Sequence, residues 1–395
     1  MREQNMIGSA GPVPQEDNLA TLTFHPLNNA DCTRIDLKDG RKILVDYADM
    51  RNADNPSDPC IDLPTALRQD LRVVERDYFD IVLFTHLDKD HTNRAGDFFH
   101  FERFSTRQGA GRIKMRELWV PAAALTEEGL DGDAQIIRQE ARHRFIEGKG
   151  IRVFSRPGRL KDFCEKNGIR LEDRLHLVTD AGKLVPGFDN LNAPGGIEIF
   201  VHNPMAWRLN DREVEERNDD AVVFQATFRE GATDTRVLFA SDVDDISLGH
   251  IVQTSKAHGN QDRLRWHVFK IPHHCSYKSL NSADKGVDKT VPIEDVRWLC
   301  EEGAEPHGIM ISTSEIIPGK GTPRDKDVQP PHRQAAAYYQ DVVNAIDGQF
   351  EVTMENSPLR NPKPSQVSIT TAGAAFVAMA SIPGDYAAAR TMRAG

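Results

Sequence analysis

Four side chains that commonly bind metal ions fall within six residues, directly after an apolar segment of the chain. They are His86, Asp88, Asp90 and His91, and the apolar segment covers residues 79–84. An apolar run of this length predicts a buried strand. Imidazole and carboxylate groups together suit a borderline or hard divalent metal. The segment therefore predicts a metal centre at the end of a strand, although a polar, solvated loop is an alternative interpretation.

Two later segments carry similar residues after predicted strands. Asp242 and Asp244 follow one such strand, and the pair His273 and His274 follows another. Two histidines directly after a buried strand rarely serve structure alone, so we expect them to face a functional site. Because the chain is most constrained at the strand end, His273 is predicted to bind metal. His274 is predicted to contact the substrate or its leaving group.

The order of these segments resembles the metallo-β-lactamase superfamily, whose signature His-x-His-x-Asp-His follows a strand. Asp88 stands where that signature has its second histidine. The resulting His-x-Asp-x-Asp-His form is similar to the branch that contains the soluble β-lactamase-like domain of the DNA-uptake protein ComEC. Residues 270–279 are similar to the Lys-x-x-His-His-Gly-Ser-x-x-Ser element of that branch, with Cys275 in place of the glycine. The resemblance covers roughly residues 19–340.

The resemblance implies an α/β fold, a four-layer αββα metallo-β-lactamase-like sandwich with metal ions at one edge of its two sheets. It implies two divalent metal ions, either Zn²⁺ or, because Asp88 adds a hard ligand, Mn²⁺. Asp242 would bridge the two ions together with a hydroxide, and paired ions of this kind lie about 3.5–4 Å apart. Asp90 and His274 are the implied catalytic residues. The implied metal ligands are His86, Asp88, Asp90, His91, His202, Asp242 and His273.

Several other positions match the same branch, and each has a plainer alternative. Asp46 ends a predicted strand at 42–47, where the family has a carboxylate that supports the metal loop, but a turn-capping carboxylate fits equally well. His202 follows a predicted strand at the place of the family's third histidine, or is a structural histidine. Asn218 and Asp219 precede an apolar strand as in the family, or form a plain turn.

Three further residues, Lys270, Ser276 and His332, complete the candidate set. Asp31 matches the aspartate of a Gly-Asp-Ser element near the start of ComEC-like domains. Lys270 and Ser276 belong to the His-His element, and we expect them to support the site or contact the substrate. His332 follows a late loop, where related domains carry a histidine beside a proline, and could enter the site from there.

Composition limits the class of protein and its compartment. The chain has 395 residues and a net charge of −11, which argues against a passive, basic nucleic-acid coat protein. A local basic cluster at 103–116 could contact nucleic acid, or could be a solvated loop. The five cysteines are scattered without a C-x-x-C pair, which predicts free thiols in a reducing, cytoplasmic compartment. We expect neither a signal peptide nor a membrane contact, because no apolar run approaches the roughly 20 residues of a membrane span.

The chain divides into three predicted parts. Residues 1–18 are polar, and we expect them to form a flexible N-terminal arm. Residues 19–340 form the predicted hydrolase domain, in which part of the segment at about 100–195 is interpreted as an insertion that shapes the substrate groove. Residues 341–395 are expected to add C-terminal strands to the same domain. Helices are predicted at 64–78, 133–148, 160–167 and 334–346, and a short strand at 175–178.

These observations predict a metal-dependent hydrolase, most simply a phosphodiesterase or nuclease that uses a metal-activated hydroxide. Nucleic acid or another phosphodiester is then the expected partner. The alternative is hydrolysis of a small carbonyl substrate, such as a lactone, thioester or β-lactam, which needs no groove for a polymer. A non-catalytic interaction module is disfavoured because the ligand set is nearly complete. By resemblance, such a hydrolase could also serve as an effector in a bacterial defence system. The sequence leaves open the exact substrate, the physiological metal and the oligomeric state.

Overall fold

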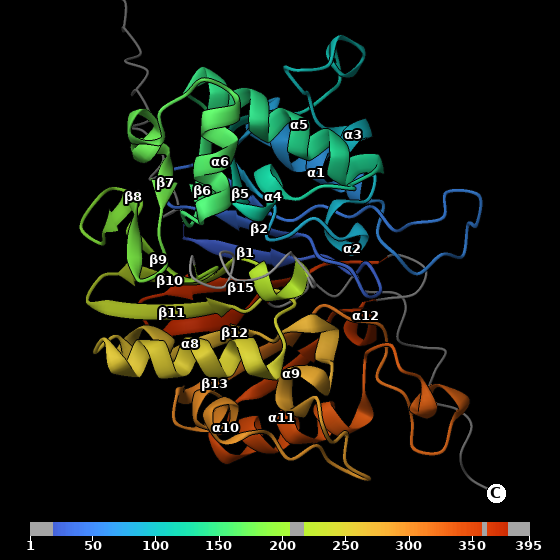
Figure 1. Cartoon of the computed structure of the whole chain (residues 1–395). Coiled ribbons are helices and arrows are strands. Elements are labelled where there is room, and N and C mark those ends of the chain that lie inside the picture. Colours follow the sequence, from blue (N-terminus) through green and yellow to red (C-terminus); the bar gives the residue numbers. More distant parts are fainter. Residues whose placement is uncertain (1–18, 206–216, 358–361, 378–395) are drawn as a thin grey trace, which may run out of the picture.

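The computed structural model describes residues 19–205, 217–357 and 362–377, and it confirms the predicted four-layer αββα sandwich. Two β-sheets lie face to face, and helices cover the outer face of each sheet (Figure 1). The predicted N-terminal arm, residues 1–18, and the chain from residue 378 onward lie outside the described residues.

The first sheet contains the N-terminal half of the chain and a hairpin from near the C-terminus. Its strands are β1 (Thr21–Phe24), β2 (Thr33–Asp36), β3 (Lys42–Val45), β4 (Tyr78–Leu83), β5 (Lys114–Pro121), β6 (Ile151–Phe154), β7 (Val178–Thr179), β15 (Ser365–Thr370) and β16 (Gly373–Phe376). Their order is β16-β15-β1-β2-β3-β4-β5-β6-β7. From β16 to β3 neighbouring strands are antiparallel, and from β3 to β7 they are parallel. The predicted hairpin between β2 and β3 turns at Gly40, whose φ of +85° suits glycine.

The second sheet is built from the C-terminal half of the chain. Its strands are β8 (Lys183–Asn190), β9 (Ile197–Asn203), β10 (Val223–Glu230), β11 (Thr233–Phe239), β12 (Trp266–Lys270), β13 (Ala304–Ser312) and β14 (Gln349–Val352). Their order is β14-β13-β12-β11-β10-β9-β8. The strands from β8 to β11 are antiparallel, and those from β11 to β14 are parallel. Each sheet therefore has a parallel half, in which neighbouring strands end at the same edge.

Long helices cover the outer faces of both sheets (Figure 1). The first sheet is covered by α1 (Leu63–Val73), α5 (Gly132–Glu147) and α6 (Gly158–Lys166), and the second by α8 (Asp245–Ala257), α10 (Glu294–Glu301) and α11 (Arg333–Ala345). The sequence predicted α1, α5, α6 and α11, but it did not predict α8 or α10. The shorter helices are α2 (Lys89–Thr92), α3 (Ala95–Phe98), α4 (Ala123–Thr126), α9 (Lys278–Asn281) and α12 (Thr353–Asn356). Further 3₁₀ segments are Ser105–Arg107, Leu171–Leu177, Arg217–Asp220, Gln261–Leu264 and Pro323–Lys326.

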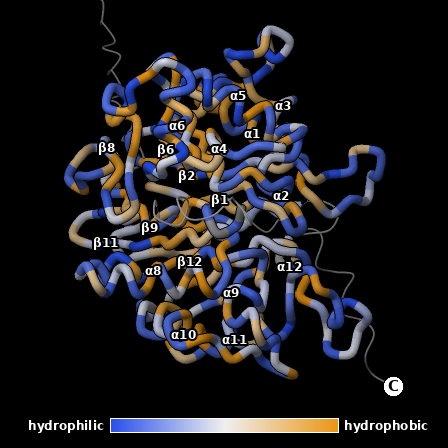
Figure 2. Tube along the Cα trace, viewed as in Figure 1, coloured by the Kyte–Doolittle hydropathy of each residue, from blue (hydrophilic) through white to orange (hydrophobic). Residues whose placement is uncertain are grey.

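Three apolar layers hold the sandwich together, one between the sheets and one under each set of helices. Strand β4 shows how one sequence serves two layers, because successive side chains of a strand point to opposite faces. Ile81 and Leu83 enter the layer between the sheets, whereas Val82 and Phe84 enter the layer under the helices of the first sheet. Both faces of β4 are buried, which explains its continuous apolar sequence. Figure 2 shows hydrophobic stretches among the sheets and hydrophilic stretches on outlying loops.

Some local predictions differ from the structure. Residues 175–178, predicted as a strand, belong mostly to the 3₁₀ segment that precedes the two-residue β7. The C-terminal strands join different sheets, because β14 extends the second sheet while β15 and β16 extend the first. Residues 100–195 supply β5, β6 and β7 to the first sheet and β8 to the second, so much of this segment belongs to the sandwich itself. Within the described ranges, no helix is both long and apolar enough to cross a membrane.

Candidate metal centre

The loops that follow β3, β4, β11 and β12 meet at one edge of the two sheets. The strands β3 and β4 are parallel neighbours, and so are β11 and β12, so each pair delivers its following loops to one edge. These loops carry Asp46, His86, Asp242 and His274 within a few residues of the strand ends. The candidate residues lie far apart in the sequence, and the sandwich brings them together.

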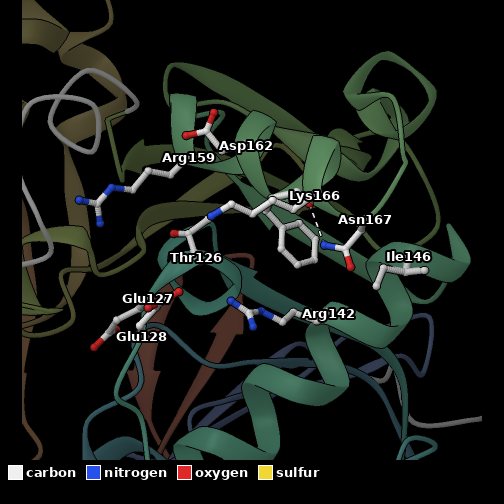
Figure 3. Close-up of a pocket in the computed structure, with 10 residues that line it drawn as sticks. Thr126, Glu127, Glu128, Arg142, Ile146, Arg159, Asp162, Lys166 and Asn167 are labelled. Atoms are coloured by element: carbon white, nitrogen blue, oxygen red, sulfur yellow. Dashed lines mark hydrogen bonds between the residues drawn. The ribbon is translucent and has the colours of Figure 1, made fainter.

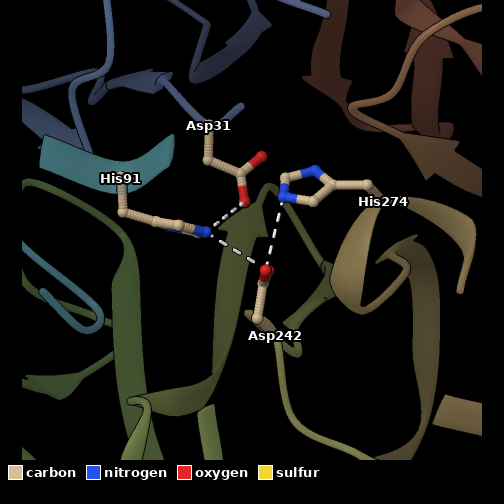
Figure 4. Close-up of side chains that lie close together, drawn as sticks. All are labelled: Asp31, His91, Asp242 and His274. Atoms are coloured by element: carbon tan, nitrogen blue, oxygen red, sulfur yellow. Dashed lines mark ion pairs between the residues drawn. The ribbon is translucent and has the colours of Figure 1, made fainter. Parts of the chain in front are cut away.

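One group of ligand atoms is fully buried and comes from four different loops. Asp31, His91, Asp242 and His274 each place one ligand atom within 4.8 Å of all the others (Figure 4). His91 Nε2 lies 3.3 Å from Asp242 Oδ1, and His274 Nε2 lies 3.3 Å from Asp242 Oδ2. Asp31 Oδ2 lies 3.7 Å from His91 Nε2. We call these four residues the buried tetrad.

A second group shares His91 with the tetrad and reaches the surface. His86, Asp90 and His91 also place ligand atoms within 4.8 Å of one another. Asp90 Oδ2 lies 3.3 Å from His274 Nε2, so Asp90 borders the tetrad as well. The Asp90 side chain is 33% exposed, whereas those of His91 and His274 are at most 1% exposed. Solvent and substrate therefore approach the centre from the side of Asp90.

The arrangement fits a metal ion. Metal–ligand bonds of about 2.0–2.2 Å place tetrahedral neighbours roughly 3.4 Å apart, close to the separations of these atoms. Nε2 of His86, His91 and His274 and Oδ1 of Asp242 are buried, with no hydrogen-bond partner among the described residues. Buried polar atoms without a partner are costly and rare. A divalent cation between them would satisfy these atoms together.

The outer nitrogens of two histidines have partners that fix the rings. His91 Nδ1 lies 2.8 Å from Asp46 Oδ2, and His274 Nδ1 lies 2.8 Å from the carbonyl oxygen of Thr313. Both contacts place the proton on Nδ1 and leave Nε2 for a metal, as in many metalloproteins. Asp46 also accepts hydrogen bonds from the Thr85 backbone N–H (2.7 Å) and hydroxyl (2.8 Å). Of the two interpretations of Asp46, this geometry favours support of the metal loop.

The carboxylates shift the pKa values of the central histidines. Burial alone would lower the pKa of His274, but Asp242 and Asp90 raise it to about 10. Burial also opposes the positive charge of His91, but Asp46 and Asp242 raise the pKa of His91 well above its usual value. Burial would raise the pKa of Asp242, but the two histidines hold it well below its usual range. The metal-free site thus holds protons that a divalent cation would displace.

Five residues at this edge have left-handed backbone conformations that non-glycine residues rarely adopt. They are Asp46 (φ 59°), Ser241 (49°), His273 (49°), His274 (53°) and Cys275 (66°). Such residues cost of order 1–3 kcal/mol each and cluster at functional sites. Ser241 and Cys275 stand where the resembled branch has glycine. The left-handed turn at 273–275 carries the His274 ring toward Asp242 (Figure 4).

Three predicted ligands do not belong to either group. His202 is engaged elsewhere, with Nε2 2.9 Å from the carbonyl oxygen of Arg263 and Nδ1 3.5 Å from Ser255 Oγ, which favours the interpretation of His202 as a structural histidine. His273 is only half-buried, and its ring centroid lies 6.2 Å from that of His274. Asp88 is 33% exposed, and its Oδ2 lies 3.9 Å from His86 Nε2.

The remaining candidates mostly support the turn at 273–277. Ser276 Oγ accepts a hydrogen bond from the Lys278 backbone N–H (3.3 Å), and His332 Nδ1 accepts one from the Tyr277 N–H (3.3 Å). Burial and Lys285 lower the pKa of His332 to about 4. Both residues therefore shape the turn from outside the two ligand groups.

Two candidates lie on the 3₁₀ segment Arg217–Asp220, and one lies inside the centre. Asn218 is half-buried, and the side chain of Asp219 lies outside the described residues. Lys270 is buried, and its Nζ donates a hydrogen bond to Asp31 Oδ2.

Sequence reasoning missed some residues of the centre. Asp31 was noted only as a match to a family element, and it is a member of the buried tetrad. The Ser241 hydroxyl donates to the Thr85 hydroxyl over 2.8 Å, which ties the two metal-loop strands together. These contacts join residues 60 to 243 positions apart along the chain, so no local pattern could reveal them.

Asp46→Asn should weaken metal affinity by roughly 10–100-fold while the fold is retained, because the amide no longer fixes the His91 tautomer. Calorimetric titration of metal-free protein with Mn²⁺ or Zn²⁺ measures this change. Asp49→Asn is the matched control, since Asp49 is also largely buried but pairs with Arg94 at 3.2 Å. Equal losses of affinity in both variants would contradict the supporting role of Asp46.

Comparisons with known proteins gave matches among solved structures but not among protein families or curated proteins. No protein-family model and no curated protein matches the chain. Among solved structures, the chain is similar to the metallo-β-lactamase GOB-18 from Elizabethkingia meningoseptica, with 13% identity, a TM-score of 0.30 and coverage of 87% of this chain and 96% of that one. It is also similar to BJP-1, a subclass B3 metallo-β-lactamase of Bradyrhizobium japonicum, with 12% identity, a TM-score of 0.28 and coverage of 82% and 92%. Similarities this weak carry no argument about function.

Proposed function

We propose that the chain is a metal-dependent hydrolase of phosphodiesters, a nuclease-type enzyme of the ComEC-like branch of the metallo-β-lactamase superfamily. The observation that carries the proposal is the buried tetrad with the partly exposed Asp90 beside it. Three of these five residues are aspartates, and an oxygen-rich set favours hard ions such as Mn²⁺ over a purely imidazole site. Hard divalent ions are the usual partners of phosphoryl groups.

His91, Asp242 and His274 would hold the ion, with Asp31 on the inner side and Asp90 on the solvent side. When bound, the metal would supply a Lewis acid that offsets charge on a phosphoryl oxygen and brings the pKa of a bound water toward neutrality. Burial would raise the pKa of Asp90, but His274 and His91 lower it below its usual range. Asp90 is therefore ionised at neutral pH, and it can orient the attacking water by accepting a hydrogen bond.

We assign the adjacent histidines to roles opposite to those predicted from the sequence. His274 has both ring nitrogens committed to the centre, one toward the ligand atoms and one toward Thr313. His273 is half-buried, and burial lowers its pKa, so its imidazole is neutral at pH 7. A neutral ring at the rim of the site can donate a hydrogen bond to the substrate. His273 is thus the candidate substrate contact, and His274 the candidate ligand.

A polar cavity beside the centre offers cationic side chains that a phosphodiester chain could contact. The cavity has a volume of about 600 Å³ and lies among α4, α5 and α6. Its lining includes the cations Arg142, Arg159 and Lys166 and the carboxylates Glu127, Glu128 and Asp162, and the charged ends of Arg142 and Lys166 point into it (Figure 3). Arg142 is held in place by a hydrogen bond from its Nε to the Leu125 carbonyl oxygen (2.7 Å). We call this cavity the helix groove.

The helix groove leads toward the metal centre. Glu127 lines the groove and also a small pocket that includes His86. Glu127 and Glu128 lie together at one end in Figure 3, and Glu127 is the residue that the groove shares with the pocket at His86, whereas Asp162 lies apart from them. A phosphodiester chain could place its scissile phosphate at the metal and neighbouring phosphates beside the cations. Such contacts position a nucleic acid without reading its sequence.

Charge reversal in the groove should separate polymer binding from chemistry. We expect Arg159→Glu/Lys166→Glu to lower kcat/KM on a long oligonucleotide by roughly tenfold per charge, and to reduce the salt dependence of binding by about one unit per lost cation. Turnover of a small chromogenic phosphodiester should change little. The matched control is Lys161→Glu/Arg170→Glu, the same charge change at two exposed residues outside the groove. Equal effects of both double variants would contradict the groove as a binding site.

The proposed function is tested by incubating metal-loaded protein with single- and double-stranded DNA, RNA, a chromogenic phosphodiester, a lactone and a β-lactam. We expect cleavage of at least one phosphodiester, and its loss after the metal is stripped. Protein that opens lactones or β-lactams but cleaves no phosphodiester with Mn²⁺ or Zn²⁺ would replace this proposal with the small-carbonyl alternative. Protein that binds no metal under metal-replete conditions would refute both.

A further inference from the structure

A buried ammonium group lies inside the candidate metal centre. Lys270 ends β12, and its side chain is 4% exposed. Its Nζ is bonded to Asp31 Oδ2, whose side chain is 3% exposed. Asp31 belongs to the buried tetrad, so the ammonium group of Lys270 directly contacts one of the candidate metal ligands.

A buried lysine in this position lowers the stability of the folded protein. Removing an ammonium group from water costs several kcal/mol, which a paired carboxylate only partly offsets. Replacing such a pair with apolar side chains is often neutral or stabilising, so a buried pair is weak evidence of a stabilising role. The pair adjoins the ligand atoms of His91, Asp242 and His274, and this position indicates a role in the charge balance of the centre.

The ligand groups have room for one complete metal position. His91 belongs to both groups, but its Nδ1 faces Asp46, so only Nε2 can bind an ion. If His91 serves the tetrad, the second group retains His86 and Asp90, and the partly exposed Asp88 Oδ2, 3.9 Å from His86 Nε2, is the third potential ligand. Asp90 Oδ2 also lies 3.3 Å from His274 Nε2. A protein metal site generally needs three or four protein ligands, and two of the three at the second position are carboxylates that are 33% exposed, so this position should hold an ion more weakly than the buried tetrad.

We propose that the centre holds a single divalent metal ion, and that the ammonium of Lys270, fixed on Asp31, supplies the second positive charge in place of a second metal ion. This inference rests on the proposed function and refines it. The carboxylates of Asp31, Asp46, Asp90 and Asp242 repel one another, and this repulsion must be offset by positive charge nearby. Lys270 offsets part of this repulsion permanently, even in the metal-free protein. Because Lys270 is buried behind Asp31, it is a positioning residue that acts through that carboxylate.

Metal content of the full-length protein tests the proposal. Metal-free protein is saturated with Mn²⁺, freed of unbound ion by gel filtration, and analysed for metal and by electron paramagnetic resonance. Wild-type protein should retain one equivalent and give the spectrum of an isolated Mn²⁺ ion. Lys270→Met removes the charge at similar volume, and it should raise the content toward two equivalents because the carboxylates then lack their permanent counter-charge and attract a second ion.

Lys42→Met is the matched control. Lys42 is also a largely buried lysine, its Nζ 2.5 Å from Asp36 Oδ1, but it lies outside both ligand groups. This variant should lose stability and still retain one equivalent.

Two tightly bound equivalents in the wild type, or a spin-coupled Mn²⁺ pair, would overturn the inference and leave the proposed function standing. If Lys270→Met still retains only one equivalent of metal, the proposal that the Lys270 ammonium replaces a second metal ion is also wrong. If Lys270→Met does not fold, the metal content and spectrum of the wild-type protein still test whether one or two ions are bound. Protein that binds no metal contradicts the proposed function itself, so the two failures are distinguishable.

Discussion

Asp242→Ala should abolish phosphodiester hydrolysis, with a loss of roughly 10³-fold or more, equivalent to a barrier increase of about 4 kcal/mol. Both carboxylate oxygens of Asp242 face the centre, Oδ1 toward His91 and Oδ2 toward His274, each over 3.3 Å. Removing the carboxylate takes away a ligand and leaves two buried imidazoles without their shared counter-charge. We therefore expect metal content to fall together with activity.

The fold should survive this change, because Asp242 lies beyond the end of β11 and its side-chain oxygens face His91 and His274. Far-ultraviolet circular dichroism measures the fold, and elemental analysis measures the metal. Asp244→Ala is the matched control two residues further on. The Asp244 side chain caps α8 by accepting a hydrogen bond from the Ser247 N–H over 2.8 Å. Loss of this helix cap in Asp244→Ala should lower the free energy of unfolding by about 1 kcal/mol and leave the metal in place.

Two outcomes would contradict this assignment. Asp242→Asn with near wild-type activity would exclude the carboxylate as a ligand, because an amide is a poor substitute for a charged oxygen at a divalent ion. Loss of metal from Asp244→Ala comparable to that from Asp242→Ala would show that any disruption after β11 empties the site. Neither outcome would change the fold assignment, which rests on the two sheets and their helices.

The layers of the sandwich and the metal loop were predictable because their signals are local. Strand β4 is a continuous apolar run, and the four candidate ligands follow it within a few residues. Helix α8 was not predicted, since the face that it buries includes Ser247, Gly249 and Ser255 and therefore gives no clear apolar stripe. Asp244 was considered as an extra acid near the site, and in the structure it caps that unpredicted helix.

The composition of the centre was only partly predictable, because tertiary contacts decide it. The order of motifs suggested His202 as a ligand, but its ring nitrogens face Arg263 and Ser255 on neighbouring elements. Asp31 lies in the connection between β1 and β2, and only the packing of the two sheets brings it against Lys270. Which of two adjacent histidines enters the centre depends on a left-handed turn that sequence periodicity does not reveal.

The histidine pair provides the sharpest comparison of sequence and structure. His274→Ala should lose most of its bound metal and at least roughly 10²-fold in activity on every substrate, because it removes a ligand rather than a proton donor. His273→Ala, its neighbour and matched control, should keep its metal. The expected loss for His273→Ala is smaller and confined to steps in which the ring contacts the substrate. Elemental analysis and kinetics on a nucleic acid and an activated phosphodiester separate these results.

Proton release gives a second readout that a merely structural role of His274 would not change. In the metal-free protein the pKa of His274 is raised to about 10, so the ring is protonated at pH 8. Metal binding must displace that proton, and metal affinity should therefore rise as pH increases toward 10. Calorimetry in buffers of different ionisation enthalpy counts the released protons, and His274→Ala should release about one fewer than His273→Ala. If His273→Ala loses the metal while His274→Ala keeps it and releases protons like the wild type, the roles first predicted from the sequence are correct. The left-handed turn would then orient a proton donor and not a ligand.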